Sequence, residues 1–177
     1  MRRAVVWLAV TVAVGGSVAG CGDSTVAPKT WVTSICQSLA PWRAKIAALN
    51  TAAQTAMASA KTPADTRTRL LEMIDGARGA SETARAAVAG AGVPDVDGGA
   101  EIERRFVASL TKVRDAYQRA DDAIAGLPTG DETAFYAGVQ AAMAQLNTDY
   151  AASGVDTDGL VSDELKADFE EVAACRS

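Results

Sequence analysis

Apolar residues recur at three- and four-residue steps through most of the chain, which is the spacing of one face of an α-helix. The first row predicts a helix over about residues 29–60, with the apolar positions Trp31, Ile35, Leu39, Trp42, Ile46, Leu49, Ala53 and Met57. Pro41 lies inside this row. Because proline lacks an N–H and its ring disfavours the helical state of the residue before it, we expect a kink or a break at this position.

A second helix is predicted to begin at Pro63, because Thr62 and Asp65 flank it in the pattern of a helix N-terminus. Its apolar face consists of Leu70, Leu71, Ile74, Ala84 and Val88. Residues 76–79 contain two glycines and form a weak point in this helix. Residues 90–99, rich in Gly, Pro and Asp, are the clearest loop of the chain.

Two further long helices and one short helix complete the pattern. The third helix carries Ile102, Phe106, Leu110, Val113, Tyr117 and Ile124, and it ends at residues 126–128. Thr129 with Glu132 predicts a capping box for the fourth helix, whose apolar row is Phe135, Val139, Met143, Leu146 and Tyr150. Ser162 predicts the start of a short fifth helix with Leu165, Phe169 and Val172 on one face. No segment has the alternation of a β-strand.

Because the connections are short, successive helices should be antiparallel. The fold expected for residues 30–177 is therefore an all-α, up-and-down bundle of four helices with a short C-terminal helix packed across it, stapled by one disulfide. The mature chain has the length of a single domain.

Residues 1–20 have the parts of an export signal: Arg2 and Arg3, then an apolar stretch over residues 4–14, then small residues before Cys21. The apolar stretch is shorter than the roughly 20 residues that a permanent membrane span requires. Residues 18–21 (VAGC) fit a bacterial lipobox, which predicts cleavage before Cys21 and acylation of its thiol. The alternative is an ordinary secretory signal followed by a free or disulfide-bonded cysteine.

Lipidation would place the protein at the extracytoplasmic face of the cell membrane. Diacylglycerol on Cys21 supplies two acyl chains, such as palmitate, and each buried CH₂ adds about 0.8 kcal/mol, so that two chains give stable anchoring. Residues 21–29 are short and polar with Gly and Pro, and they are expected to form a tether between the lipid and the domain.

Cys36 and Cys175 remain after Cys21 is assigned to lipid, and they lie near the two ends of the mature domain. An exported protein meets an oxidising compartment, which favours a disulfide between them. The alternative is a pair of buried free thiols.

The charge of the chain limits its partners. The net charge of −5 becomes −7 when the signal with Arg2 and Arg3 is removed. Nucleic acid is therefore disfavoured as a partner. An acidic domain is also repelled by an anionic membrane surface, so that the lipid on Cys21 must provide the attachment to the membrane.

Candidate chemistry is sparse because the chain has no histidine. Ser-His and Cys-His nucleophiles are excluded, and no cofactor or metal site is predicted. The carboxylate pairs Glu72/Asp75 and Asp97/Glu101 are more typical of a solvated helix face than of an active site. Residues 95–98 and 156–159 resemble fragments of calcium loops, but the twelfth positions hold Phe106 and Ala167 rather than glutamate, which favours turns. We therefore expect the protein not to be an enzyme.

Trp31 and Trp42 are the candidate ligand-facing residues. They are eleven residues apart, which is three helical turns, and could line a pocket for an aromatic or glycan ligand. Such a pair is more often part of a hydrophobic core, and this is the interpretation that we prefer.

Three features together resemble the uncharacterised lipoproteins and small secreted proteins of actinobacteria: Trp31-Val32-x-x-Ile35-Cys36 at the start of the domain, the turn at residues 92–96 (GVPDV) followed by Gly98, and a late cysteine. The resemblance implies export, a bond between Cys36 and Cys175 and a helical fold, and it implies nothing catalytic.

The function expected from these features is that of a membrane-anchored, non-enzymatic interaction or binding protein of the cell envelope, with an envelope protein as its partner. The alternative is a small-molecule binding module that uses a Trp-lined pocket.

Overall fold

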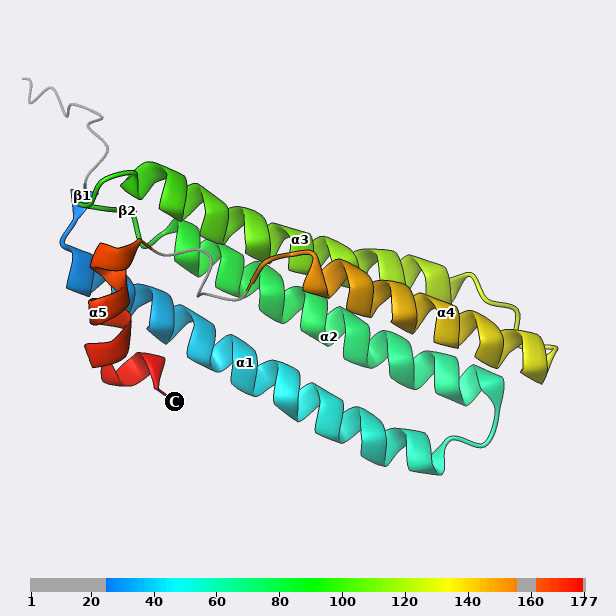
Figure 1. The fold of residues 1–177 in the computed structure, drawn as a ribbon. Helices are drawn as coiled ribbons and strands as arrows, with labels where there is room; N and C mark the ends of the chain where they lie inside the picture. The colour runs from blue at the N-terminus through cyan, green and yellow to red at the C-terminus, as the bar shows by residue number, and fades with distance from the viewer. Residues whose placement is uncertain (1–24, 156–161, 177) are drawn as a thin grey trace, which may run out of the picture.

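The computed structural model describes residues 25–155 and 162–176. It is all-α, as predicted: long antiparallel helices follow one another along the chain, and a short helix crosses one end of them (Figure 1). The elements are β1 (Thr25–Val26), α1 (Pro28–Ser59), α2 (Pro63–Ala89), β2 (Val93–Pro94), α3 (Gly99–Ala125), α4 (Glu132–Ala151), α5 (Asp163–Glu171) and the 3₁₀ turn η2 (Ala173–Cys175).

The predicted start of α2 is confirmed, and that of α4 is wrong. The hydroxyl of Thr62 accepts a hydrogen bond from the backbone N–H of Asp65 at 3.1 Å. At α4, however, the cap is Asp131 rather than Thr129, and its carboxylate accepts from the N–H of Ala134 at 3.0 Å. Aspartate is an equally good cap, and its charge also favours the positive end of the helix dipole.

The helix α1 runs without a break through Pro41, which corrects the expectation of an interruption there. Pro41 is exposed. Water can therefore hydrate the carbonyl of Gln37, four residues back, that loses its intrahelical partner. Leu39 and Trp42, on the other side of the helix, pack into the core. This packing keeps the segments before and after Pro41 in one straight helix.

The helix α2 is also continuous through its predicted weak point. Gly76 lies against the side chain of Leu49 on α1, since a Cβ atom built there would stand 2.9 Å from Cδ2 of Leu49. The glycine costs helix propensity but leaves room for the Leu49 side chain.

A short parallel pairing that the sequence did not indicate ties the N-terminal end of the domain to the loop before α3. Thr25 pairs with Val93 and Val26 with Pro94, and the N–H of Asp95 donates to the carbonyl of Val26 at 2.9 Å. Two-residue strands are too short to show alternation. The second half of the segment expected as a tether, residues 25–29, thus lies in β1 and the start of α1.

The helices pack in chain order: α1 on α2, α2 on α3 and α3 on α4. Among the described residues, α1 and α4 make almost no contact, so that the bundle is open on one side. The core is formed by the predicted apolar rows, and its largest fully buried side chains are Trp31, Phe135, Ile35, Ile74, Ile102, Leu110, Ile124 and Leu165.

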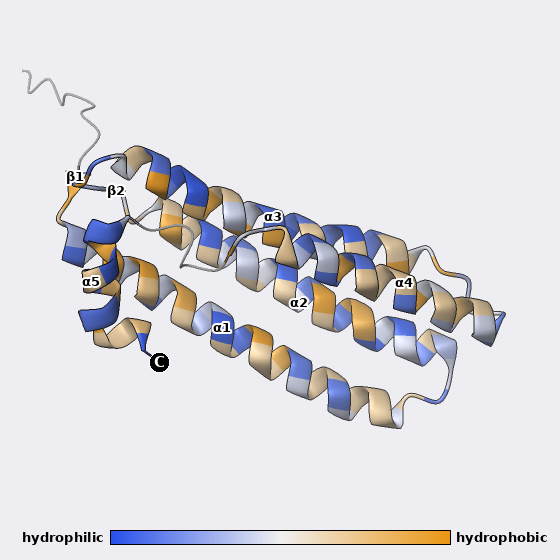
Figure 2. Ribbon diagram, in the orientation of Figure 1, coloured by the Kyte–Doolittle hydropathy of each residue, from blue (hydrophilic) through white to orange (hydrophobic). Residues whose placement is uncertain are grey.

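Polar positions interrupt the apolar rows along every long helix (Figure 2). Within residues 25–155 and 162–176, no helix has both the length and the apolar character needed to cross a bilayer.

Candidate functional site

The structure separates the two tryptophans that the sequence grouped together. Trp31 has no exposed surface, its indole N–H donates to the carbonyl of Gly92 at 2.8 Å, and its ring meets Phe106 edge-on with centroids 5.4 Å apart. It therefore belongs to the core, where it holds the loop before α3 against α1.

Trp42 is also buried, but it lies beside a groove. Its indole N–H donates to the hydroxyl of Ser81 at 3.1 Å, and that hydroxyl donates to the carbonyl of Ala77 at 2.8 Å. Because this chain of hydrogen bonds fixes the ring, Trp42 presents a rigid surface to the groove.

We call this hollow the Trp42 groove. It lies between α1 and α2 and has a volume of about 650 Å³, within the range of roughly 300–1,000 Å³ that is typical of ligand sites. Its lining consists of Ser34, Gln37, Ser38, Pro41, Trp42 and Lys45 from α1 and Gly76, Ala80, Thr83, Ala84 and Ala87 from α2.

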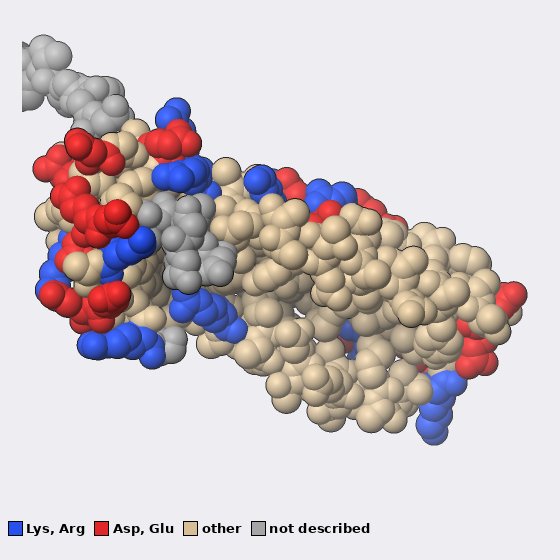
Figure 3. All heavy atoms as spheres, in the orientation of Figure 1, with Lys and Arg blue, Asp and Glu red and all other residues tan. Residues whose placement is uncertain are grey.

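A second candidate surface is the open side between α1 and α4. Here residues 46–59 of α1 and residues 133–148 of α4 contain no charged side chain, and we call them the uncharged face. Figure 3 shows a broad uncharged surface over these helices, with charges at the two ends of the molecule and along the edge formed by α3.

A small cleft of about 220 Å³ marks the end of this face nearest α5, where Ile46 and Asn50 of α1 approach Tyr150 of α4. Burial raises the pKa of the Tyr150 phenol, and nearby Arg43 opposes the shift. The phenol is thus neutral at physiological pH and adds no charge to the face.

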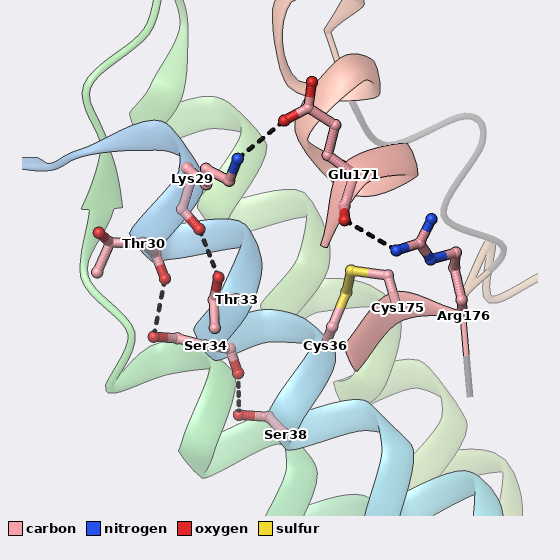
Figure 4. Close-up of a disulfide and its surroundings, with 9 residues drawn as sticks. All are labelled: Lys29, Thr30, Thr33, Ser34, Cys36, Ser38, Glu171, Cys175 and Arg176. Atoms are coloured by element: carbon pink, nitrogen blue, oxygen red, sulfur yellow. Dashed lines mark hydrogen bonds and ion pairs between the residues drawn. A yellow bond between two sulfur atoms is a disulfide. The ribbon is translucent and has the colours of Figure 1, made fainter. Parts of the chain in front are cut away.

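The disulfide between Cys36 and Cys175 is formed, with the two Cα atoms 4.9 Å apart. It fastens η2 and the end of α5 to the first half of α1 (Figure 4). Lys29 pairs with Glu171 at 2.8 Å beside it, and the Arg176 guanidinium donates to the Glu171 carbonyl at 3.2 Å. This corner is therefore a structural clamp.

The carboxylates of Glu72, Asp75, Asp97 and Glu101, expected on a solvated helix face, lie on the protein surface. Glu72, Asp75 and Glu101 each pair with an arginine three residues away on the same helix, and all are exposed. This is the arrangement of a solvated helix surface rather than of a general acid and base.

The calcium-like fragment at residues 95–98 is a turn in which Gly98 adopts a left-handed conformation, with φ of 70°, immediately before α3. The second fragment, residues 156–159, lies outside the described residues, as does Cys21. Among the residues that are described, no three Cys, Asp or Glu side chains lie close enough to share a metal ion.

A charged cluster between α2 and α3 is not apparent from the sequence. Glu82 accepts from Arg85 on its own helix and from Arg114 on α3 at 2.9 Å. Hydrogen bonds from these two guanidinium groups lower the pKa of Glu82 to about 2. The three-residue spacing to Arg85 is visible in the sequence, but the partner 32 residues away is not.

Comparison of the chain with protein-family models, with curated proteins and with solved structures finds no match. What the groove and the uncharged face can bind follows from their own side chains.

Proposed function

We propose that this chain is a lipid-anchored, extracytoplasmic binding protein of the cell envelope that performs no catalysis and presents the uncharged face to a helix of a protein partner. The single observation that carries this proposal is the open side of the bundle. Ile46 and Met57 of α1 and Val139 and Met143 of α4 remain half-buried there, because α1 and α4 do not close on each other.

A partner helix fits this surface on physical grounds. Helix-in-groove recognition uses apolar anchors at three- and four-residue steps. Ile46 and Met57 lie three helical turns apart on α1, and Val139 and Met143 lie four residues apart on α4. Since the chain has a net negative charge, a partner of like charge meets least electrostatic repulsion at a face that carries no charged side chain.

Crosslinking in the cells that express the protein, followed by affinity purification and mass spectrometry, tests this function. Ala47→Glu places a charge in the cleft beside Ile46 and should reduce recovery of the partner at least tenfold. Ala108→Glu, the same change at an exposed position of α3, is the matched control and should leave recovery unchanged. Equal recovery from both variants would contradict the proposed face.

The anchor has its own test. Cys21→Ala should abolish labelling with fatty acid and release the protein from the membrane fraction or leave it uncleaved. Normal processing and membrane retention of this variant would show that the lipobox interpretation is wrong.

A second candidate function is small-molecule binding, and the Trp42 groove favours it. The groove is the only one of the two candidate surfaces that has a rigid aromatic wall and a volume typical of ligand sites. Quenching of Trp42 fluorescence by an envelope metabolite, with loss of quenching when the groove is filled by Ala80→Leu, would support this function.

A further inference from the structure

The helix α1 has an unusual charge pattern for an acidic protein: it contains Lys29, Arg43 and Lys45 and no acidic residue. Lys29 is neutralised by Glu171. Within the part of the chain that the structure describes, Lys45 has no hydrogen bond or ion pair, and it is the only charged side chain that lines the Trp42 groove. The groove therefore offers one unneutralised positive charge.

The rest of the lining gives little polar recognition. The hydroxyls of Ser34, Ser38 and Thr83 donate to carbonyls of their own helices. The N–H of Trp42 is taken by Ser81. Apart from Gln37, the donor left for a ligand is the ammonium group of Lys45, which favours a ligand with one anionic end and an apolar body.

The length of the groove indicates what that body is. From Ser34 to Lys45 the helix rises about 16 Å at 1.5 Å per residue. The hydrocarbon core of a bilayer is roughly 30 Å thick, so that one acyl chain is about 15 Å long. Beyond Lys45 the groove is closed where Leu49 meets Gly76, which places the anionic end at Lys45 and the chain against Trp42 and Ala84.

We propose that the Trp42 groove binds a single-chain amphipathic carboxylate of the fatty-acid class, with its carboxylate at Lys45 and its alkyl chain along Trp42 toward Ser34. This proposal rests on the second proposed function and specifies its ligand. The ligand is a free monomeric amphiphile rather than a lipid within the bilayer, because the groove has room for one chain.

The test is calorimetric titration of the mature chain, residues 21–177 with Cys21→Ser, by monomeric laurate. This variant needs no detergent and carries no acyl chain of its own to compete. We expect one laurate per chain, together with a change in Trp42 fluorescence. Lys45→Met should weaken binding about tenfold, because it removes the charge and keeps most of the stem. Arg43→Met removes the neighbouring cation of α1, which does not line the groove, and it should leave the affinity within twofold.

A second pair of variants tests the groove itself. Ala80→Leu fills it and should abolish binding, whereas Ala108→Leu, at an exposed position of α3, should not. Circular dichroism and the thermal midpoint of each variant separate loss of binding from loss of folding. Equal effects of Lys45→Met and Arg43→Met, or unaltered binding by Ala80→Leu, would overturn the assignment.

Two probes of other chemistry separate failure of this proposal from failure of the function on which it rests. If dodecyltrimethylammonium binds as tightly as laurate and Ala80→Leu abolishes both, the anionic class is wrong and small-molecule binding stands. If neither dodecyl probe binds, both are wrong. Lys45-dependent sedimentation with phosphatidylglycerol vesicles in the absence of laurate binding would overturn the free-amphiphile assignment.

Discussion

Residues 31–42 of α1 contain six buried side chains, including Trp31, Ile35 and Cys36, whereas residues 43–59 of the same helix contain none. Both halves continue one apolar row. The first half is enclosed by α2, α5 and η2, and the second half has α2 on one side and the open face on the other. Periodicity thus fixes which face of a helix is apolar, while the neighbours of that face decide how much of it is buried.

The largest change in the free energy of unfolding should come from removing the disulfide between Cys36 and Cys175, which fastens η2 to the first half of α1. In the chain-entropy model, a disulfide that spans 139 residues stabilises the fold by up to about 5 kcal/mol. Cys36→Ala with Cys175→Ala should lower the free energy of unfolding toward that limit in a denaturant titration. Loss of less than 1 kcal/mol would mean that packing alone encloses this half of α1.

The two halves can be compared directly with one residue type. Ile35→Ala should cost about 3 kcal/mol, because the side chain is fully buried. Ile46→Ala, on the same helix and half-buried, should cost about 1 kcal/mol. Equal losses in denaturant titrations would contradict the division of α1 into a packed and an open half.

Pro41 lies at the boundary between the halves. Proline is about 3 kcal/mol less favourable than alanine in a helix interior, so that Pro41→Ala should stabilise the protein by up to about 3 kcal/mol. The measurement is the shift of the denaturation midpoint. A destabilised variant would show that the first half of α1 needs the proline for its packing.

The smallest effect concerns the seam between α2 and α3, which involves neither half of α1. The pKa of Glu82 is lowered to about 2 in the folded state. Its contribution to stability is therefore present above about pH 4.5 and is lost as the pH falls toward 2. Glu82→Gln should flatten the dependence of stability on pH in this window.

Arg114→Met serves as the partner test for this seam. Loss of the guanidinium should raise the pKa of Glu82 and move the acid-induced loss of stability to higher pH, as measured by thermal unfolding between pH 2 and 6. An unchanged pH profile in both variants would mean that other carboxylates control the acid transition.

Apolar periodicity and helix-capping patterns predicted most of the fold but little of the candidate sites. The apolar rows gave the helices and their core faces, and Thr62 with Pro63 gave the start of α2. The continuity of α1 through Pro41 could not be foreseen, because it depends on which side of the helix is exposed.

The candidate sites depend on contacts between segments that are distant in the sequence. Trp31 and Trp42 have the same residue type and the same helical phase, but Trp42 lies beside a groove lined by small residues of α2, whereas Trp31 contacts Gly92 and Phe106. The absence of charge from residues 46–59 and 133–148 is visible in the sequence. That these two segments flank the same open side of the bundle is not visible there, since their separation depends on how α4 docks onto α3.

The pairing of Thr25 and Val26 with the loop before α3 limits the distance between Cys21 and the folded domain. If Cys21 carries the lipid, at most about 14 Å of chain separates it from Thr25. The end of the bundle that carries β1 then faces the headgroups. The opposite end, with residues 60–62 and 126–131, stands about 40 Å farther out, which is the length of the 27-residue helix α3. If the lipid is there, the short strand pair limits how far the β1 end of the bundle can move from the membrane and leaves the opposite end as the outermost part of the protein.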